Sequence, residues 1–177
     1  MKINGFSSNN KDRLNELLKK YKLYQLPIDV TKLGNYLGIN IYPADILIQS
    51  LKGENKYSNL RGFFNIDKAQ QQKDIIIDSF QSKEYQMLVI AYLICSYLFK
   101  ENSQSKYRIV YIDDEIDKEI LIEAKNLLVP NDLLDRQIKK FSSSNDGEKL
   151  YLQLQEKFKV PDFVLREKIK KYGERGR

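Results

Sequence analysis

The sequence has no histidine and a single cysteine, Cys95, among its 177 residues. Without imidazole groups, the chain lacks the commonest general base and the commonest nitrogen ligand for a metal. One cysteine makes no disulfide within the chain, and alone it cannot form a thiolate zinc site. We therefore expect no metal and no cofactor. We also expect Cys95 to be a buried, inert thiol, because no histidine is present to activate it.

Long apolar runs are also scarce. The longest extends from Met87 to Phe99, which is too short to cross a bilayer and is typical of a buried core helix. Residues 1–10 are polar and lack the apolar stretch of a signal peptide. These two observations predict a cytoplasmic protein that does not enter a membrane.

The excess of positive over negative charge is confined to one end of the sequence. Residues 1–135 hold 18 Lys and Arg against 18 Asp and Glu, whereas residues 136–177 hold 12 against 6, which accounts for the net charge of +6. This asymmetry predicts an acidic partner for the C-terminal segment, either a nucleic acid or an acidic protein. The alternative is a basic segment that is simply solvated.

Helix and strand patterns together predict an α+β fold, with a small antiparallel sheet packed against helices. Strand patterns occur at residues 39–42, 60–66, 74–80 and 107–112. Helix patterns occur at residues 14–21, 29–37, 83–100, 113–129, 131–141, 148–158 and 162–172. Gly173 is predicted to end the last helix. A polar connector at residues 142–145 divides the chain into two expected units, 1–141 and 142–177.

Several segments, taken in order, resemble one known family. They are Leu26-Pro27-Ile28-Asp29-Val30 through Ile39, Gly62-Phe63-Phe64 followed by Ile75-Ile76-Ile77-Asp78, Ile90-Ala91 through Phe99, and Glu119 through Leu127-Leu128-Val129-Pro130. Their order and spacing are similar to those of the ImmA/IrrE family of metallopeptidases. The resemblance implies a zincin-like arrangement of the sheet and the apolar helix.

The resemblance also implies that the catalytic residues are lost. The family's zinc-binding helix carries His-Glu-x-x-His, with two ligands one turn apart and a glutamate that activates water. Here the first histidine becomes Tyr92, the glutamate becomes Leu93 and the second histidine becomes Ser96, so that Glu119 alone could correspond to a zinc ligand. We expect a catalytically inactive relative. We favour the simpler alternative that Tyr92, Leu93 and Ser96 fill the core, and Glu119 can equally be an exposed or capping residue.

Active members of that family cleave repressors of phages or mobile elements. An inactive member is expected to bind such a repressor, or another regulator, without cutting it. A divergent enzyme is the least favoured reading, because Leu93 cannot polarise water.

The C-terminal helices have a helix-turn-helix-like spacing around Lys159-Val160-Pro161. The last helix, however, begins Asp162-Phe163-Val164, where a base-reading helix presents Arg, Asn or Gln. We therefore favour a protein partner and expect any binding to nucleic acid to be weak. DNA binding through this segment is the alternative. The residues predicted to contact either partner are Lys159, Arg166, Lys168, Lys170, Lys171 and Arg175.

Overall fold

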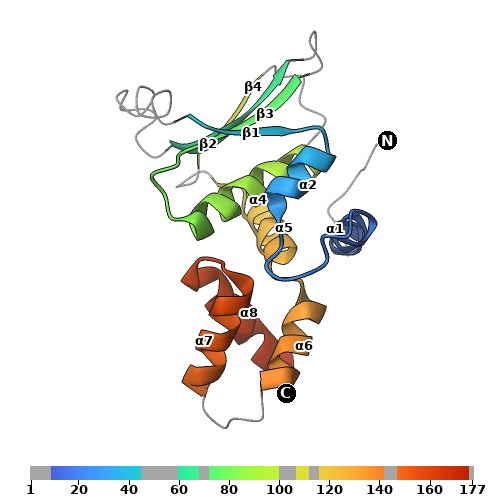
Figure 1. Cartoon of the computed structure of the whole chain (residues 1–177), viewed down its shortest axis with the longest axis vertical. Helices are drawn as coiled ribbons and strands as arrows, with labels where there is room; N and C mark the ends of the chain where they lie inside the picture. Colours follow the sequence, from blue (N-terminus) through green and yellow to red (C-terminus); the bar gives the residue numbers. More distant parts are fainter. Residues whose placement is uncertain are drawn as a thin grey trace.

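The computed structural model describes residues 9–44, 60–67, 72–99, 107–111, 116–141 and 147–175. Within these ranges the chain forms seven helices and four strands, so the α+β class is confirmed (Figure 1). The elements are α1 (Asn9–Lys20), α2 (Val30–Tyr36), β1 (Asn40–Pro43), β2 (Leu60–Asp67), β3 (Gln72–Ile77), α4 (Lys83–Phe99), β4 (Tyr107–Tyr111), α5 (Lys118–Leu128), α6 (Asn131–Phe141), α7 (Gly147–Phe158) and α8 (Asp162–Arg175).

The sheet is mixed, so the prediction of an antiparallel sheet was wrong for one strand. Its order is β1-β3-β2-β4. Strand β2 is antiparallel to both β3 and β4, but β1 runs parallel to β3, with Ile41 opposite Ile75. A free strand edge accepts a partner in either direction, so the pattern of side chains along β1 does not reveal its direction. The direction follows instead from how α2 delivers the chain to the sheet.

Helix α4 occupies the centre of the fold. It packs on β2 and β3, and it also contacts α2 and α5 (Figure 1). Its residues 88–96 are all buried, as the apolar run predicted. A helix covered on several sides is apolar all round rather than amphipathic. Gly62 of β2 permits the close approach, because a Cβ atom there would lie 2.9 Å from Cγ1 of Val89.

Several predicted boundaries differ from those of the structure; α5, for example, begins at Lys118 after the Asp117 cap rather than at residue 113. Two of the differences have a clear local cause. Strand β3 ends at Ile77 rather than Phe80, because the Asp78 carboxylate accepts a hydrogen bond from the Phe80 N–H at 3.1 Å and forms a turn. Helix α8 continues through Gly173 to Arg175. Glycine lowers helix stability by only about 1 kcal/mol, so a single glycine in an exposed last turn does not end the helix.

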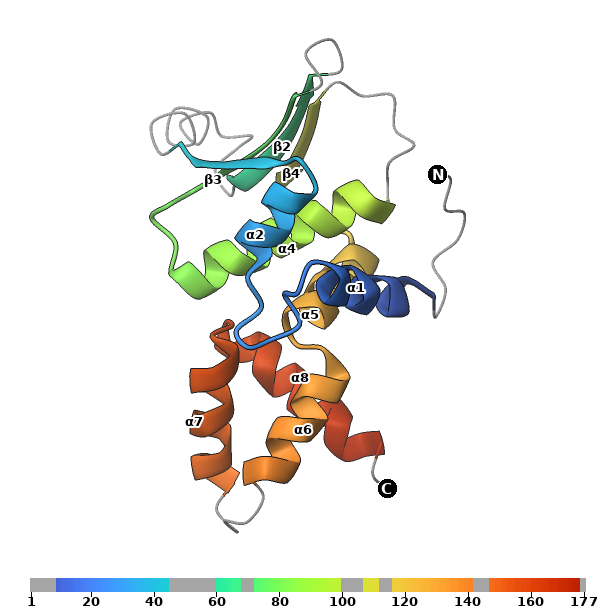
Figure 2. The same cartoon turned by 45° about the vertical axis from the view of Figure 1, so that its right-hand side comes forward.

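Helices α6, α7 and α8 lie together at the end of the molecule opposite the sheet (Figure 2). Leu154 and Phe158 of α7 and Val164 and Leu165 of α8 are buried, and they belong to the same apolar core as α4. Residues 142–145, predicted as a connector, lie outside the described residues, as does most of the acidic stretch before α5. In the described part of the chain, no helix combines the length and the apolar character needed to span a membrane.

Candidate functional site

The motif positions on α4 are enclosed by the core. Tyr92, Leu93 and Ser96 are 4%, 0% and 6% exposed. The Tyr92 hydroxyl accepts a hydrogen bond from the backbone N–H of Asp117 at 3.2 Å, and burial raises the pKa of Tyr92. This side chain therefore anchors α4 to the residue that caps α5. The prediction that Tyr92 and Leu93 are core residues is confirmed.

Glu119, the position that could correspond to a third ligand, is exposed in the first turn of α5. Its backbone N–H donates to the Asp117 carboxylate at 3.0 Å, as part of the N-terminal cap.

Burial, with a smaller contribution from the charge of Glu123, raises the pKa of the Cys95 thiol well above its ordinary value. Cys95 is thus a protonated core residue. Among the described residues, no three Cys, Asp or Glu side chains are grouped closely enough to hold a metal ion.

The start of α8 is tied to α7 by a cluster of three side chains. Arg166 donates to the Asp162 carboxylate at 2.6 Å, and its guanidinium lies 4.4 Å from the centre of the Tyr151 ring. The Tyr151 hydroxyl donates to the same carboxylate. Burial and this hydrogen bond raise the pKa of Tyr151 to about 12, while the bond from Arg166 lowers the pKa of Asp162. Arg166, predicted as a phosphate contact, thus already has an acidic partner.

Lys168, predicted as a contact to a partner, is largely buried. It is 7% exposed and donates to the side-chain oxygens of Asn126 at 2.6 Å and Asn131 at 3.0 Å. The periodicity of α8 contained the signal, because Lys168 follows Val164 by four residues and so falls on the buried stripe. Neighbouring Lys171 is exposed and forms an ion pair with Glu167 at 2.8 Å.

The other predicted contact residues are more open. Lys159 is exposed just after α7, at a φ of 50°. Its N–H donates to the Gln155 carbonyl, in the left-handed conformation that often ends a helix. Lys170 is exposed on α8. Arg175 ends α8, and its side chain lies outside the described residues.

An open groove of about 700 Å³ runs between α7 and α8. We call it the α7–α8 groove. Its apolar lining includes Leu150, Leu152 and Ile169, and Leu152 is 61% exposed. The sequence analysis did not single out Leu152, because it lies off the ridge of Leu150, Leu154 and Phe158 that forms the buried face. The complete lining is Gly147, Glu148, Leu150, Tyr151, Leu152, Arg166, Ile169 and Lys170.

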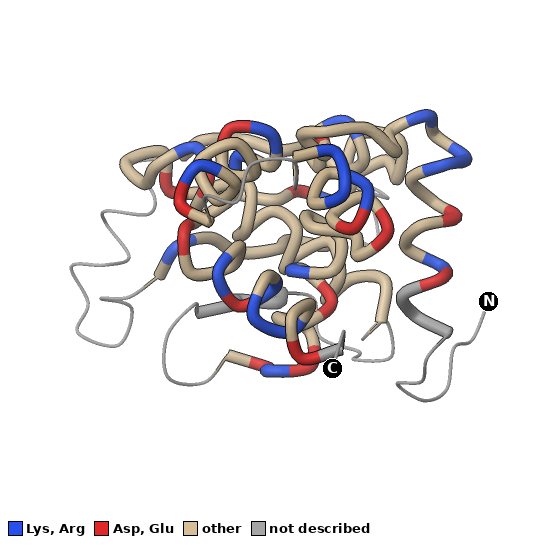
Figure 3. Tube along the Cα trace, turned by 90° about the horizontal axis from the view of Figure 1, so that it is seen from below, with Lys and Arg blue, Asp and Glu red and all other residues tan. Residues whose placement is uncertain are grey.

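Basic and acidic residues are interspersed at this end of the molecule (Figure 3). A surface that follows a nucleic-acid backbone gathers basic side chains on one face. Here Lys171, Arg166 and Lys139 each form an ion pair with an acidic residue one turn away on the same helix. The excess charge of the C-terminal segment is therefore distributed rather than gathered.

Comparison with known proteins found no family model and no curated protein that matches the chain.

Proposed function

We propose that this chain is a non-catalytic binding protein with an ImmA/IrrE-like, zincin-like body, and that it binds a protein partner in the α7–α8 groove. The groove, apolar along its length and exposed at Leu152, is the observation that carries the proposal. The partner segment is an amphipathic helix with acidic residues, supplied by a repressor or similar regulator of a phage or mobile element. The setting that suits this role is the cytoplasm.

The absence of catalysis is supported by the surroundings of α4. An active peptidase keeps an open coordination position and a carboxylate that activates water. At the corresponding positions this chain has Leu93, which is fully buried, and Tyr92, whose hydroxyl accepts from the N–H of the α5 cap Asp117. A substrate that reached this helix would meet a packed apolar core.

The acidic helix is favoured by the shape and the charge of the groove. Two helices lying side by side offer a trough into which a third helix can place its apolar face. Lys170 is an exposed cation in the lining, whereas Arg166 is already paired with Asp162. The whole segment 136–177 carries the net charge of the chain. Acidic residues beside the apolar face of the partner would therefore complement the groove and speed association.

DNA binding through a helix-turn-helix-like α7–α8 pair ranks second. Of the five basic residues on α8 that were predicted to contact a partner, Lys168 is buried, while Arg166 and Lys171 have acidic partners. Asp162 adds a negative charge where a recognition helix approaches the bases. Binding to DNA through this surface would therefore be weak, insensitive to sequence and reduced by salt.

The test is selection of helical peptides from a random display library on the full-length protein. Selected peptides should share apolar residues at helical spacing with flanking acids. They should bind the Leu152→Asp and Lys170→Glu variants at least about tenfold more weakly than the wild type, a loss of about 1.4 kcal/mol in binding free energy. The matched control is Phe80→Asp, since Phe80 is 72% exposed and lies before α4, outside the groove lining.

Two results would refute the proposal. One is a set of peptides whose affinity falls with Phe80→Asp but is unchanged by Leu152→Asp. The other is tight binding to one DNA sequence at physiological salt that Arg166→Ala abolishes, which would make DNA the primary partner.

A further inference from the structure

Helices α1 and α2 carry a pair of stacked tyrosines on the surface. The rings of Tyr21 and Tyr36 lie within 5° of parallel, with their centroids 4.8 Å apart. Tyr21 packs against the apolar core, whereas Tyr36 is 55% exposed at the end of α2. Because the stack covers one face of the Tyr36 ring, its exposed area belongs to the other face and to the ring edge. A flat group from a partner could therefore extend the stack.

Three lysines lie around the end of α1. Lys19 and Lys20 are in its last turn, Lys22 follows two residues later, and all three are exposed. Residues 17–28 contain no Asp or Glu. The ammonium nitrogen of Lys20 lies 5.3 Å from the centroid of the Tyr21 ring, which attracts the cation without carrying a net charge. We call Lys19, Lys20, Lys22 and Tyr36 the α1–α2 surface.

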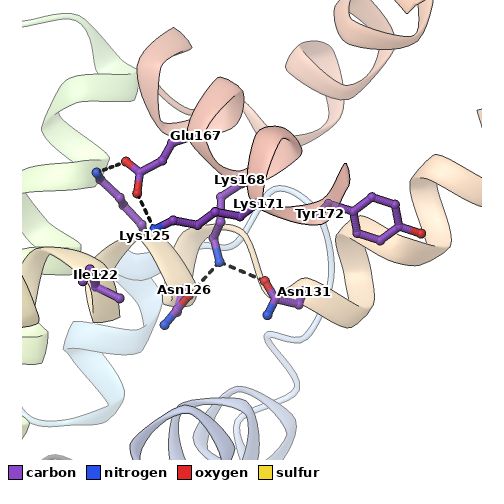
Figure 4. Close-up of a pocket in the computed structure, with 8 residues that line it drawn as sticks. All are labelled: Ile122, Lys125, Asn126, Asn131, Glu167, Lys168, Lys171 and Tyr172. Atoms are coloured by element: carbon purple, nitrogen blue, oxygen red, sulfur yellow. Dashed lines mark hydrogen bonds and ion pairs between the residues drawn. The ribbon is translucent and has the colours of Figure 1, made fainter. Parts of the chain in front are cut away.

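The charge of this surface is not neutralised by neighbouring acids. In the part of the chain that the structure describes, none of the three lysines lies within ion-pair distance of a carboxylate. Lys32 of α2 is paired with Asp29 at 3.3 Å, so that pair adds no net charge. Around α8 the situation differs, because Lys125 and Lys171 both donate to the Glu167 carboxylate (Figure 4). Where α1 ends, the trace shows basic residues with no acidic residue among them (Figure 3).

The backbone conformation of Lys22 is one that favours glycine. Its φ is 58°, and its N–H donates to the Lys19 carbonyl at 3.0 Å where the chain leaves α1. Glycine is the residue that most often ends a helix in this way, so folding alone does not call for a lysine here. Lys159 has the same conformation, with a φ of 50°, at the end of α7. The chain thus offers a matched pair of lysines for an experiment.

We propose that the α1–α2 surface binds single-stranded nucleic acid, with an unpaired base stacked on Tyr36 and phosphates against Lys19, Lys20 and Lys22. Proteins that bind single strands combine basic side chains along the backbone with aromatic rings on which bases stack. An acidic peptide could satisfy the lysines, but Asp and Glu offer the Tyr36 ring no flat partner. This surface shares no residue with the α7–α8 groove, so the inference does not depend on the proposed protein partner.

The test is fluorescence anisotropy of a labelled oligothymidine titrated with the full-length protein. Wild type should bind it in a saturable manner, and more tightly than a duplex with the same number of phosphates, whose bases have no free face. Tyr36→Ala should weaken binding about tenfold, because one base loses its stacking partner, whereas Tyr36→Phe should keep the affinity. Phe163→Ala removes an aromatic ring that is 46% exposed on α8 and should have no effect.

Lys22→Gly tests the phosphate contacts without touching the tyrosine stack. At about 0.15 M salt it should weaken binding about fourfold, and the slope of log K against log salt should shrink by about 0.7, the counterion release expected for one phosphate of a single strand. Glycine suits a positive φ, so the variant should be as thermally stable as wild type. Lys159→Gly makes the same exchange in the same backbone conformation and should change neither affinity nor slope.

Several results would overturn the proposal. One is a Kd weaker than about 1 mM for oligothymidine with wild type. Another is binding that is unchanged in Tyr36→Ala and Lys22→Gly, or that falls equally in Phe163→Ala and Lys159→Gly. Tighter binding to the duplex would also contradict it. Polyglutamate that binds as tightly as oligothymidine of equal charge would indicate an acidic protein as the occupant of this surface instead.

Discussion

Replacing Leu93 by alanine tests the central feature of the fold, the enclosed helix α4. Leu93 and its neighbour Ile94 are completely buried, and Tyr92 is 4% exposed. The substitution removes three carbon atoms, and at about 0.8 kcal/mol for each buried methylene the transfer contribution is about 2.4 kcal/mol. The sheet and α5 hold α4 from different sides, so the cavity collapses only in part. The total loss in the free energy of unfolding should be about 3–5 kcal/mol.

The measurement is urea unfolding followed by circular dichroism. With a slope of roughly 2 kcal/mol per molar urea, the midpoint should fall by about 1.5–2.5 M while the slope stays constant. Leu152→Ala is the matched control, because it makes the same chemical change at a side chain that is 61% exposed. Its effect should stay within about 0.5 kcal/mol.

A loss below about 0.5 kcal/mol for Leu93→Ala, the range of surface substitutions, would contradict the burial of α4. Such a result would mean that the motif position faces solvent or an open cleft. The non-catalytic reading of α4 would then lose its structural support.

Three further predictions test other contacts. Tyr92→Phe should lower stability by about 1 kcal/mol in thermal unfolding, because the Asp117 N–H loses its acceptor; unchanged stability would contradict this. Glu167 has a pKa below its ordinary 4.5, so its contribution to stability is present above that value and is lost as pH falls through the folded pKa. The stability difference between wild type and Glu167→Gln should therefore shrink on acidification, and a difference independent of pH would count against the ion pairs. Gly62→Ala should cost about 1–3 kcal/mol in urea unfolding, because its Cβ would lie 2.8 Å from the Ile76 carbonyl oxygen of β3 and 2.9 Å from Val89 Cγ1 of α4; a neutral effect would show that β2 can move away from both.

The sequence by itself determined the elements whose signals are local. A continuous apolar run from Met87 to Phe99 leaves a helix no polar face, so burial of Tyr92 and Leu93 follows from the run itself. Pro130 ends α5 as predicted, because a proline lacks the N–H that a continuing helix needs. The start of α5 was predicted wrongly, because the helix begins at Lys118 after the Asp117 cap rather than at residue 113. The charge asymmetry of residues 136–177 is likewise a property of composition.

Only the tertiary structure decided which helices, strands and side chains those elements contact. The direction of β1 depends on how α2 packs beside the sheet, and the two possible directions have similar side-chain patterns. The α7–α8 groove and the α1–α2 surface each combine residues from different helices. Lys168 lies on the buried stripe of α8, but its acceptors are supplied by α5 and α6, far away in the sequence. Periodicity shows which face of a helix is turned inward, whereas long-range packing alone determines which side chains of other elements that face contacts.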